Sequence, residues 1–406
     1  MHVLYIAPHF PSAQVRFLIA LKQVGAKVTG LGEPPAHELP SEVASMLDGW
    51  EQVSNVTDPN ALYDAVRRVQ AREWVDRLEA TIEAHMLPAA QVREACTIPG
   101  LSYQQTLLCR DKTVMKEFMR EHHIPCAASI AADNAESVIN FGRYHGYPII
   151  LKPRDGAGAN QTWKVDSEEA LMAVLPETGI LHGHSFAIEE FVEGHEGFYD
   201  TLTVNGQIKH DFISHYYPNV LEAMRHRWIS PMIVCTNRHS EPGYEEVKAM
   251  GSKVIQELGL HTSPTHMEWF FGEKGLKFSE IGARPPGVSH WDIYSAANDI
   301  DLYKEWADSI VHQNSWGQLS RQYSAAQMAL RPTQDGIIQR YEGMEEMQAK
   351  YGEWVFDSYF PPIGSGTQPI EEGYKANAWI HIKHPDYDIL REMCREISMT
   401  IKVIAA

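Results

Sequence analysis

The sequence predicts a mixed α/β and α+β fold, built from several consecutive parts. Two observations support this prediction. The first hundred residues alternate apolar strand-like runs with amphipathic segments, the pattern of a parallel sheet covered by helices. From residue 186 onward, short strand-like runs recur with few long helical segments between them. A chain of 406 residues is long enough for two or three compact units.

The first part, residues 1–105, is predicted to be a Rossmann-like unit. A buried strand is expected at HVLYIA, a helix at VRFLIALKQVG that ends at Gly25, and a second strand at AKVTGLG. A dinucleotide site would need G-x-G-x-x-G after the first strand, but that loop reads PHFP, so no cofactor is assigned here.

Residues 60–98 are expected to be largely helical because they are rich in Ala, Arg and Glu. Within them, the run DRLEATIE allows two interpretations. It is either a loop that brings Glu79 and Glu83 to a site or a helix with an acidic solvent-exposed face, and the helix is favoured.

The second part, residues 106–188, follows a break at Pro99 and Gly100. Asp111 is expected to cap a helix with an apolar stripe, and ESVINFGRYHGYP is expected to form another short helix. A strand, a glycine-containing loop and a second strand should then follow in IILKPRDGAGANQTWKV.

The third part, residues 189–315, is expected to contain most of the remaining strands, among them FYDTLTV, QIKHDFIS, MEWFFG and LKFSEIG. The tail, residues 316–406, holds further short strands and a terminal helix at DYDILREMCREI. It is predicted to be a small α+β subdomain that packs on the part before it.

Composition excludes several classes of function. The net charge of −18 argues against a nucleic-acid partner, which would need clustered Lys and Arg. The sequence contains no run of about 18 apolar residues, so no membrane span is expected. The apolar start is interpreted as a strand and not as a signal peptide. Five scattered cysteines without a C-x-x-C pair predict free thiols and a cytoplasmic location.

Lys152 is the first candidate for chemistry. It ends an apolar strand-like run, where a lysine is costly unless its ammonium group meets an anion. The loop after it carries Gly156 and Gly158, which let a backbone approach a polyphosphate closely. An ordinary hairpin would give the same glycine pattern, so this signal is weak by itself.

Acidic residues supply the next candidates. Glu189 and Glu190 follow two apolar residues in FAIEEFVEGHEG, and a strand that continues into a connector can offer backbone groups to an adenine. Glu196 would lie within reach of a ribose. The alternative is a solvated acidic turn, and the motif alone does not decide between them.

Glu268 and Glu280 lie on two strand-like runs joined by the turn GEKG. Both alternate with apolar neighbours, so they should face one another on the same side of a hairpin. Two inward carboxylates repel unless a cation sits between them, and Mg²⁺ is usually held by one or two carboxylates plus phosphate oxygens. Arg284 would then place a fixed positive charge beside a transferred phosphoryl group.

In this order, the strand lysine, glycine loop, connector carboxylates, paired carboxylates and arginine resemble an ATP-grasp enzyme. The resemblance covers nearly the whole chain and is best between about 105 and 315. It implies an N-terminal Rossmann-like domain, an ATP-grasp module of two subdomains and a C-terminal subdomain. It implies ATP and Mg²⁺ as cofactors, with two ions possible, or Mn²⁺.

The resemblance also implies roles for individual residues. Lys112 and Lys152 would contact the nucleotide, Glu196 would hold the ribose, and Glu268 and Glu280 would bind the metal. Arg284 and Lys152 would be catalytic. The phosphates would be covered by the loop at Gly156, Ala157, Gly158 and Ala159, and the adenine would be lined by Glu189, Glu190, Phe191 and Val192.

Two positions depart from the pattern of the family. Gly282 stands where an asparagine usually adds a metal ligand, so a water or another residue would have to replace it. Ala159 and Gln161 stand where the phosphate loop usually has Ser and Gly. A divergent subfamily and a degenerate nucleotide-binding domain both fit these departures, and the four retained residues Lys152, Glu268, Glu280 and Arg284 favour an active enzyme.

The reaction implied by the resemblance is the joining of a carboxylate to an amine through an acyl phosphate, on amino acids or small acids. A substrate carboxylate would need an arginine, and the candidates are Arg225, Arg227 and Arg238, with Gly287 near the acyl group. The alternatives are a biotin-type or other ATP-dependent carboxylase, whose expected base position is Val288, and a nucleotide-binding protein without turnover. The partners would be small molecules and, in one reading, a second copy in a homodimer.

Overall fold

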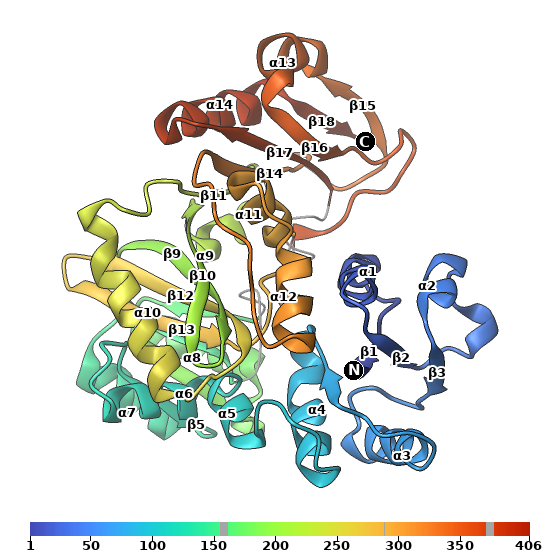
Figure 1. Cartoon of the computed structure of the whole chain (residues 1–406). Coiled ribbons are helices and arrows are strands. Elements are labelled where there is room, and N and C mark those ends of the chain that lie inside the picture. Colours follow the sequence, from blue (N-terminus) through green and yellow to red (C-terminus); the bar gives the residue numbers. More distant parts are fainter. Residues whose placement is uncertain (155–160, 288, 371–376) are drawn as a thin grey trace.

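The structure is a computed structural model that describes residues 1–154, 161–287, 289–370 and 377–406. Figure 1 shows three regions around one large sheet: the N-terminal elements (blue), the elements of a smaller sheet (teal to green) and the C-terminal elements (orange to red). No helix of the described residues is long and apolar enough to cross a membrane.

The N-terminal elements form the parallel sheet that the sequence predicts. Its strand order is β3-β2-β1-β4, and all three pairs are parallel. Its strands are β1 (His2–Ile6), β2 (Lys27–Gly32), β3 (Gly49–Gln52) and β4 (Arg77–Glu79). Its helices are α1 (Val15–Gln23), α2 (Ser41–Met46), α3 (Pro59–Gln70) and α4 (Glu83–Ala95).

The favoured helix at DRLEATIE was wrong. Its centre is β4, in which the fully buried Leu78 pairs with Leu4, and α4 begins only at Glu83. A strand of three residues is too short to display alternation, so its neighbours along the chain gave no signal for it. This arrangement puts the start of α4 at the carboxyl edge of the parallel sheet.

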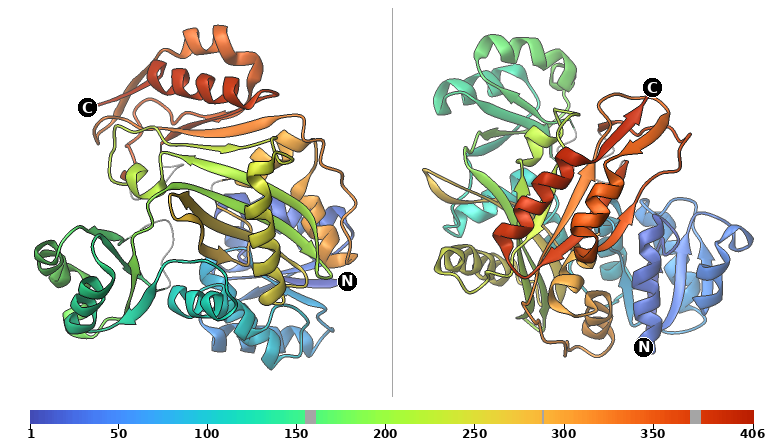
Figure 2. Two further views of the ribbon diagram at one scale, coloured as in Figure 1. Left: turned by 90° about the vertical axis from the view of Figure 1, so that its left-hand side faces the viewer. Right: turned by 90° about the horizontal axis from the view of Figure 1, so that it is seen from above.

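The smaller sheet has four strands in the order β5-β8-β6-β7. Its elements are β5 (Ser129–Ala132), α7 (Ala135–His145), β6 (Ile149–Pro153), β7 (Trp163–Val165), α8 (Glu168–Thr178) and β8 (Phe186–Glu190). The sheet is thus completed by a strand that runs past residue 188. Figure 2 shows these elements (green) standing out from the rest of the molecule.

Two helices lead into the smaller sheet, and the second of them contacts both sheets. They are α5 (Tyr103–Leu108) and α6 (Lys112–Glu121). Asp111 caps α6 as predicted, accepting hydrogen bonds from the backbone of Thr113 and Val114. The apolar face of α6 joins a core with the large sheet, in which Met115 and Met119 lie with Met267. Helix α6 is therefore fixed to the large sheet.

The large sheet has eight strands in the order β13-β12-β9-β10-β11-β14-β17-β16. Its first five strands along the chain are β9 (His195–Val204), β10 (Gln207–Tyr217), β11 (Met232–Cys235), β12 (Ser263–Gly272) and β13 (Gly275–Gly282). The helices of this region are α9 (Val220–Ala223), α10 (Glu245–Glu257), α11 (His290–Asn298) and α12 (Leu302–Val311). Aromatic side chains of α1, α11 and α12 share one core, where Phe17 contacts Trp291 and Trp306.

The C-terminal elements extend the large sheet. They are β14 (Ser324–Leu330), β15 (Ile338–Glu342), α13 (Met344–Tyr351), β16 (Val355–Tyr359), β17 (Ala378–His384), α14 (Tyr387–Thr400) and β18 (Lys402–Ala405). Strand β14 pairs with β11 on one side and with β17 on the other, so the tail and the part before it share one sheet. Short 3₁₀ turns lie at Ser12–Gln14, Ala36–Glu38, Ile180–His182, Pro242–Tyr244 and Gly352–Trp354.

Candidate active site

A cavity of about 720 Å³ lies between the smaller sheet and the large sheet. Its walls carry side chains of β6 and β8 on one side and of β9, β10, β12 and β13 on the other. The candidate residues that line it are Lys112, Lys152, Glu189, Glu190, Phe191, Val192, Glu196, Arg225, Glu268, Glu280, Arg284 and Gly287. Most of the sequence-derived candidates therefore share one cavity.

Lysines crowd one wall of this cavity. Lys152 is the second-last residue of β6, and its Nζ lies 3.0 Å from a Glu189 carboxylate oxygen. Lys116 of α6 reaches the same oxygen at 2.6 Å and is only 2% exposed. Burial opposes ionisation of Glu189, but the two lysines outweigh burial and lower its pKa. For Lys116, burial prevails over the attraction of Glu189 and lowers the pKa of its ammonium group.

Glu280 belongs to the lysine wall as well. Its carboxylate lies 3.4 Å from Nζ of Lys112 and 4.0 Å from Nζ of Lys152. Burial opposes its ionisation, but Lys112 and Lys152 outweigh burial and lower the pKa of Glu280 to about 2. Burial likewise opposes the charge of Lys152, but Glu189 and Glu280 raise its pKa. Both groups are therefore charged at neutral pH.

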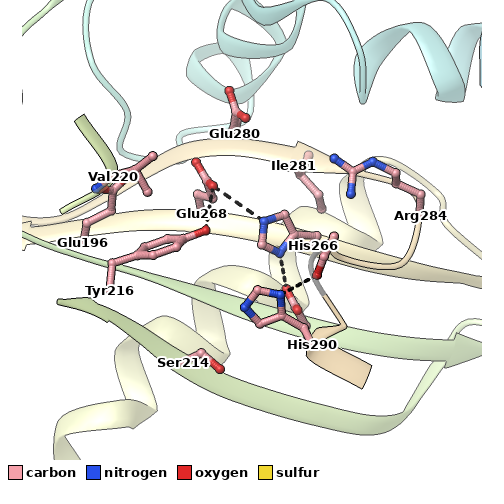
Figure 3. A network of polar contacts seen from close by, with 12 residues as sticks. Glu196, Ser214, Tyr216, Val220, His266, Glu268, Glu280, Ile281, Arg284 and His290 are labelled. Carbon is pink, nitrogen blue, oxygen red and sulfur yellow. Dashed lines mark hydrogen bonds and ion pairs between the residues drawn. The ribbon is translucent and has the colours of Figure 1, made fainter. Parts of the chain in front are cut away.

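Glu268 lies directly opposite Glu280 in the β12–β13 hairpin. This confirms the predicted pairing across neighbouring strands, and directly opposed residues of an antiparallel pair point to the same face. The Tyr216 hydroxyl donates to Glu268 at 3.2 Å, and Figure 3 shows Tyr216 of β10 and His266 of β12, the strand of Glu268, pointing toward this carboxylate.

Glu196, at the start of β9, faces the same cavity. Its carboxylate accepts a hydrogen bond from the backbone N–H of Val220 at 2.7 Å. Burial, followed by the negative charge of Glu268, raises the pKa of Glu196 to about 8. The two metal candidates thus lie within electrostatic reach of a third carboxyl group.

The donor set suits a hard cation that also has phosphate ligands. Among the described residues, no group of three His, Cys, Asp or Glu side chains could enclose a metal ion alone. Glu268 and Glu280 can supply two carboxylate ligands, and their negative charges also raise the pKa of the nearby Glu196. The remaining coordination positions of a cation would be open to phosphate oxygens and waters, which is how Mg²⁺ is usually bound. Glu268 and Glu280 therefore fit the metal of a metal–nucleotide complex.

Sequence reasoning missed His266 and Asp200, which adjoin the metal candidates. His266 places Nδ1 2.8 Å from Asp200 and Nε2 3.6 Å from Glu268. Burial alone would lower the pKa of His266, but the adjacent Asp200 and Glu268 raise it to about 10. The available signal was spacing, because His266 precedes Glu268 by two residues on a strand and so shares its face.

Sequence reasoning also missed Lys116. It lies one helical turn after Lys112, so both ammonium groups leave α6 on the same side. This spacing was visible in the sequence, but an exposed helix face would have shown the same two lysines.

Arg284 joins the N-terminal unit to the cavity. Its guanidinium group pairs with Glu83 at the start of α4, and Arg110 lies 3.5 Å from the same carboxylate. Glu83 therefore contacts a candidate catalytic residue. This contact agrees with the interpretation that was less favoured from the sequence, in which a loop brings Glu83 to a site. Glu280 and Arg284 each have an ion-pair partner elsewhere, which is Lys112 for Glu280 and Glu83 for Arg284.

The connector after β8 lies at one end of the cavity. The backbone N–H of Glu190 donates to Ala128 at 2.9 Å, and its side chain pairs with Lys274 at the hairpin turn. The ammonium group of Lys164 lies 4.3 Å from the ring centre of Phe191. The predicted phosphate loop at Gly156, Ala157, Gly158 and Ala159 lies outside the described residues, and so does Val288.

The structure separates the substrate candidates. Arg225 and Gly287 line the cavity. Arg227 pairs with Asp335, and Arg238 pairs with Asp388 at 2.5 Å on α14. Neither Arg227 nor Arg238 is part of the cavity lining.

Known proteins match this chain in sequence and in fold. The family model for the ATP-binding domain of the carbamoyl-phosphate synthase L chain matches residues 111–195. An L-arginine-specific L-amino acid ligase of Bacillus subtilis is 24% identical over 306 residues, which cover 74% of this chain and 73% of that protein.

Two solved structures share the fold over nearly the whole length. The L-amino acid ligase of Bacillus licheniformis superposes with a TM-score of 0.79 at 17% identity, covering 100% of this chain and 98% of that one. The N5-carboxyaminoimidazole synthetase of Staphylococcus aureus complexed with ADP gives a TM-score of 0.68 at 16% identity, covering 97% and 96%. The chain therefore has the fold of these ligases, and its sequence is similar to the carbamoyl-phosphate synthase ATP-binding domain and to an L-amino acid ligase.

Proposed function

We propose that the chain is an ATP- and Mg²⁺-dependent ligase that joins a carboxylate to an amine. The observation that carries this proposal is the convergence in one cavity of Lys112, Lys116 and Lys152, the opposed Glu268 and Glu280, and Arg284. Lysines suit the phosphates of ATP, and the opposed glutamates suit a divalent cation. The amino acid ligases named among the relatives support amino acids or small acids as substrates.

In the proposed reaction, a substrate carboxylate attacks the terminal phosphate of ATP, which gives an acyl phosphate and ADP. An amine then displaces phosphate and forms the amide. Lys152, Lys112 and Arg284 line the cavity. In this proposal the two lysines hold the phosphates and offset their charge, and Arg284 stabilises the charge that develops on the transferred group. A bound Mg²⁺ would neutralise phosphate charge and align the leaving group.

Arg225 is the proposed contact for the substrate carboxylate. It is the one of the three arginine candidates that lines the cavity. Glu196 is proposed to hold the ribose, and Glu190 and Val192 are proposed to bind the adenine through backbone groups. The position of each residue along the cavity wall from β8 to β9 supports these roles.

A panel of amino acids and small acids, alone and in pairs, tests the proposal through phosphate release and mass spectrometry of the products. Amine-dependent release of ADP with an amide product supports the ligase. Release that depends on bicarbonate and biotin would instead support a carboxylase, and ATP binding without release in any mixture would support a binding protein.

A further inference from the structure

We propose that Tyr294, Asp200 and His266 form a positioning chain that orients the Glu268 carboxylate for the metal of a bound metal–nucleotide complex. The inference rests on the proposed role of Glu268 as a metal ligand. It deepens that role, because it names residues outside the metal contacts that determine how well the metal is held.

The positioning chain links side chains of α11, β9 and β12 by direct contacts. The hydroxyl of Tyr294 on α11 donates to one Asp200 oxygen at 2.6 Å, and the other Asp200 oxygen lies 2.8 Å from Nδ1 of His266. Nε2 of His266 then faces Glu268 at 3.6 Å. Figure 3 shows the imidazole ring of His266 standing between this carboxylate and the region of His290. Helix α11 thus connects through β9 to the metal candidate on β12.

The outer end of the positioning chain is held in place. Asp200 is 2% exposed and Tyr294 is fully buried. The Tyr294 ring stacks on Phe212 with ring centres 4.2 Å apart and planes 3° from parallel, and Ser214 donates to its hydroxyl at 3.4 Å. A buried aspartate with donors on both oxygens has one orientation available, and so does the imidazole that it contacts.

The strand beyond His266 leaves room for this arrangement. Gly282 lies directly opposite His266 in the β12–β13 pair and contributes no side chain to that face. His266 and Tyr216 both contact the Glu268 carboxylate and therefore restrict its orientation. Partners of this kind fix the geometry of metal-binding carboxylates, and their removal usually lowers metal affinity by about 10- to 100-fold.

A second cluster of the same composition serves as an internal reference. Tyr199 donates to Asp211 at 3.0 Å, and His239 lies 2.7 Å from the same Asp211 oxygen. Residue 199 alternates with residues 198 and 200 along β9, so this cluster lies on the opposite face of the sheet. Its aspartate pairs with Arg321, and none of its residues lines the cavity.

The experiment measures binding of Mn²⁺ to the full chain at saturating ADP by electron paramagnetic resonance. The Tyr294→Phe variant is expected to weaken Mn²⁺ binding by about 3- to 10-fold, and Asp200→Asn by about 10- to 100-fold. The matched Tyr199→Phe variant is expected to bind Mn²⁺ as the wild type does. Thermal unfolding of each variant separates a general loss of stability from a loss of metal affinity.

Wild-type Mn²⁺ affinity in a folded Tyr294→Phe variant would overturn the positioning chain, as would an equal loss in Tyr199→Phe. Should Asp200→Asn fail to fold, His266→Gln takes its place, with the same expected loss of affinity. The readout does not depend on turnover. A wild type that binds Mn²⁺ with ADP but makes no amide would refute the ligase alone, and a wild type that binds no Mn²⁺ would refute both.

Discussion

The two walls of the cavity treat buried carboxyl groups in opposite ways. On the lysine wall, Glu280 has its pKa lowered to about 2 because Lys112 and Lys152 outweigh burial. On the opposite wall, which β9, β10 and β12 form and which is called the strand wall below, Glu196 has its pKa raised to about 8 because burial and Glu268 act together. A glutamate side chain thus remains ionised on one wall, whereas another glutamate retains its proton on the other.

This difference indicates which ligand charge each wall can accept. The positive charges of the lysine wall are already balanced by carboxylates of the protein. A polyphosphate that bound there would therefore share these lysines with Glu189 and Glu280. The strand wall has an excess of carboxyl groups, and an incoming cation would relieve their repulsion. A metal–nucleotide complex brings both charges at once, which neither free ATP nor a free cation does.

Glu280→Gln should have the largest effect, because Glu280 pairs with the lysines of one wall and lies opposite Glu268 of the other. It removes one of the two opposed carboxylates and leaves Lys112 without its partner on β13. ATP-dependent product formation is expected to fall by about 1,000-fold. Glu168→Gln, which alters an exposed ion pair with Arg143, is the matched control. Full product formation in Glu280→Gln would refute the proposed chemistry.

Lys116→Met tests whether compensation on the lysine wall contributes to stability. The substitution leaves the buried Glu189 with Lys152 as its remaining ion-pair partner. Breaking a buried pair from one side costs about 3–5 kcal/mol when the remaining charge has no other partner. Because Lys152 still compensates Glu189, the free energy of unfolding should drop by about 3 kcal/mol or less in urea titrations. The double variant Lys116→Met/Glu189→Gln should recover part of the loss, and no recovery would contradict the pairing.

Glu196→Gln tests the strand wall through pH, without metal or nucleotide. The folded protein holds this proton up to about pH 8, whereas the unfolded chain releases it near the ordinary pKa of 4.5. The wild type should therefore lose stability relative to Glu196→Gln as the pH rises from about 4.5 to 8. Denaturant titrations at pH 5, 6.5 and 8 measure the difference, and a constant difference would show that Glu196 does not retain its proton.

The smallest effects are expected from two arginine substitutions, one in the cavity lining and one outside it. Arg225→Ala should raise the KM for the carboxylate substrate by about tenfold, because Arg225 lines the cavity. Arg238→Ala should change this KM by less than about twofold, since Arg238 forms surface ion pairs with Asp388 and Glu241. Steady-state kinetics with varied carboxylate concentration decides, and the reverse ranking would reassign the substrate contact.

Local patterns in the sequence were enough to predict part of the site. Alternation with apolar neighbours placed Glu268 and Glu280 opposite one another, because the period of a strand fixes which residues share a face. Asp111 was predicted as a helix cap from its residue type and position alone.

Features that depend on pairing between distant segments could not be read in this way. Glu83 meets Arg284 across 201 residues of chain, and nothing beside either residue indicates the other. The addition of β14 to the edge of β11 is likewise decided by packing between segments about 90 residues apart. The same limit hid the burial of Lys116, which only the contact with Glu189 explains.

The shared large sheet has a practical consequence for dividing this protein. A chain cut near residue 315 would remove β14 and leave the backbone donors and acceptors of β11 without their partner strand. Exposed strand edges of this kind invite pairing with other chains, and the adjoining core would lose apolar residues such as Met328 and Ile380. Such a fragment is expected to aggregate, so functional dissection should rely on point substitutions in the intact chain.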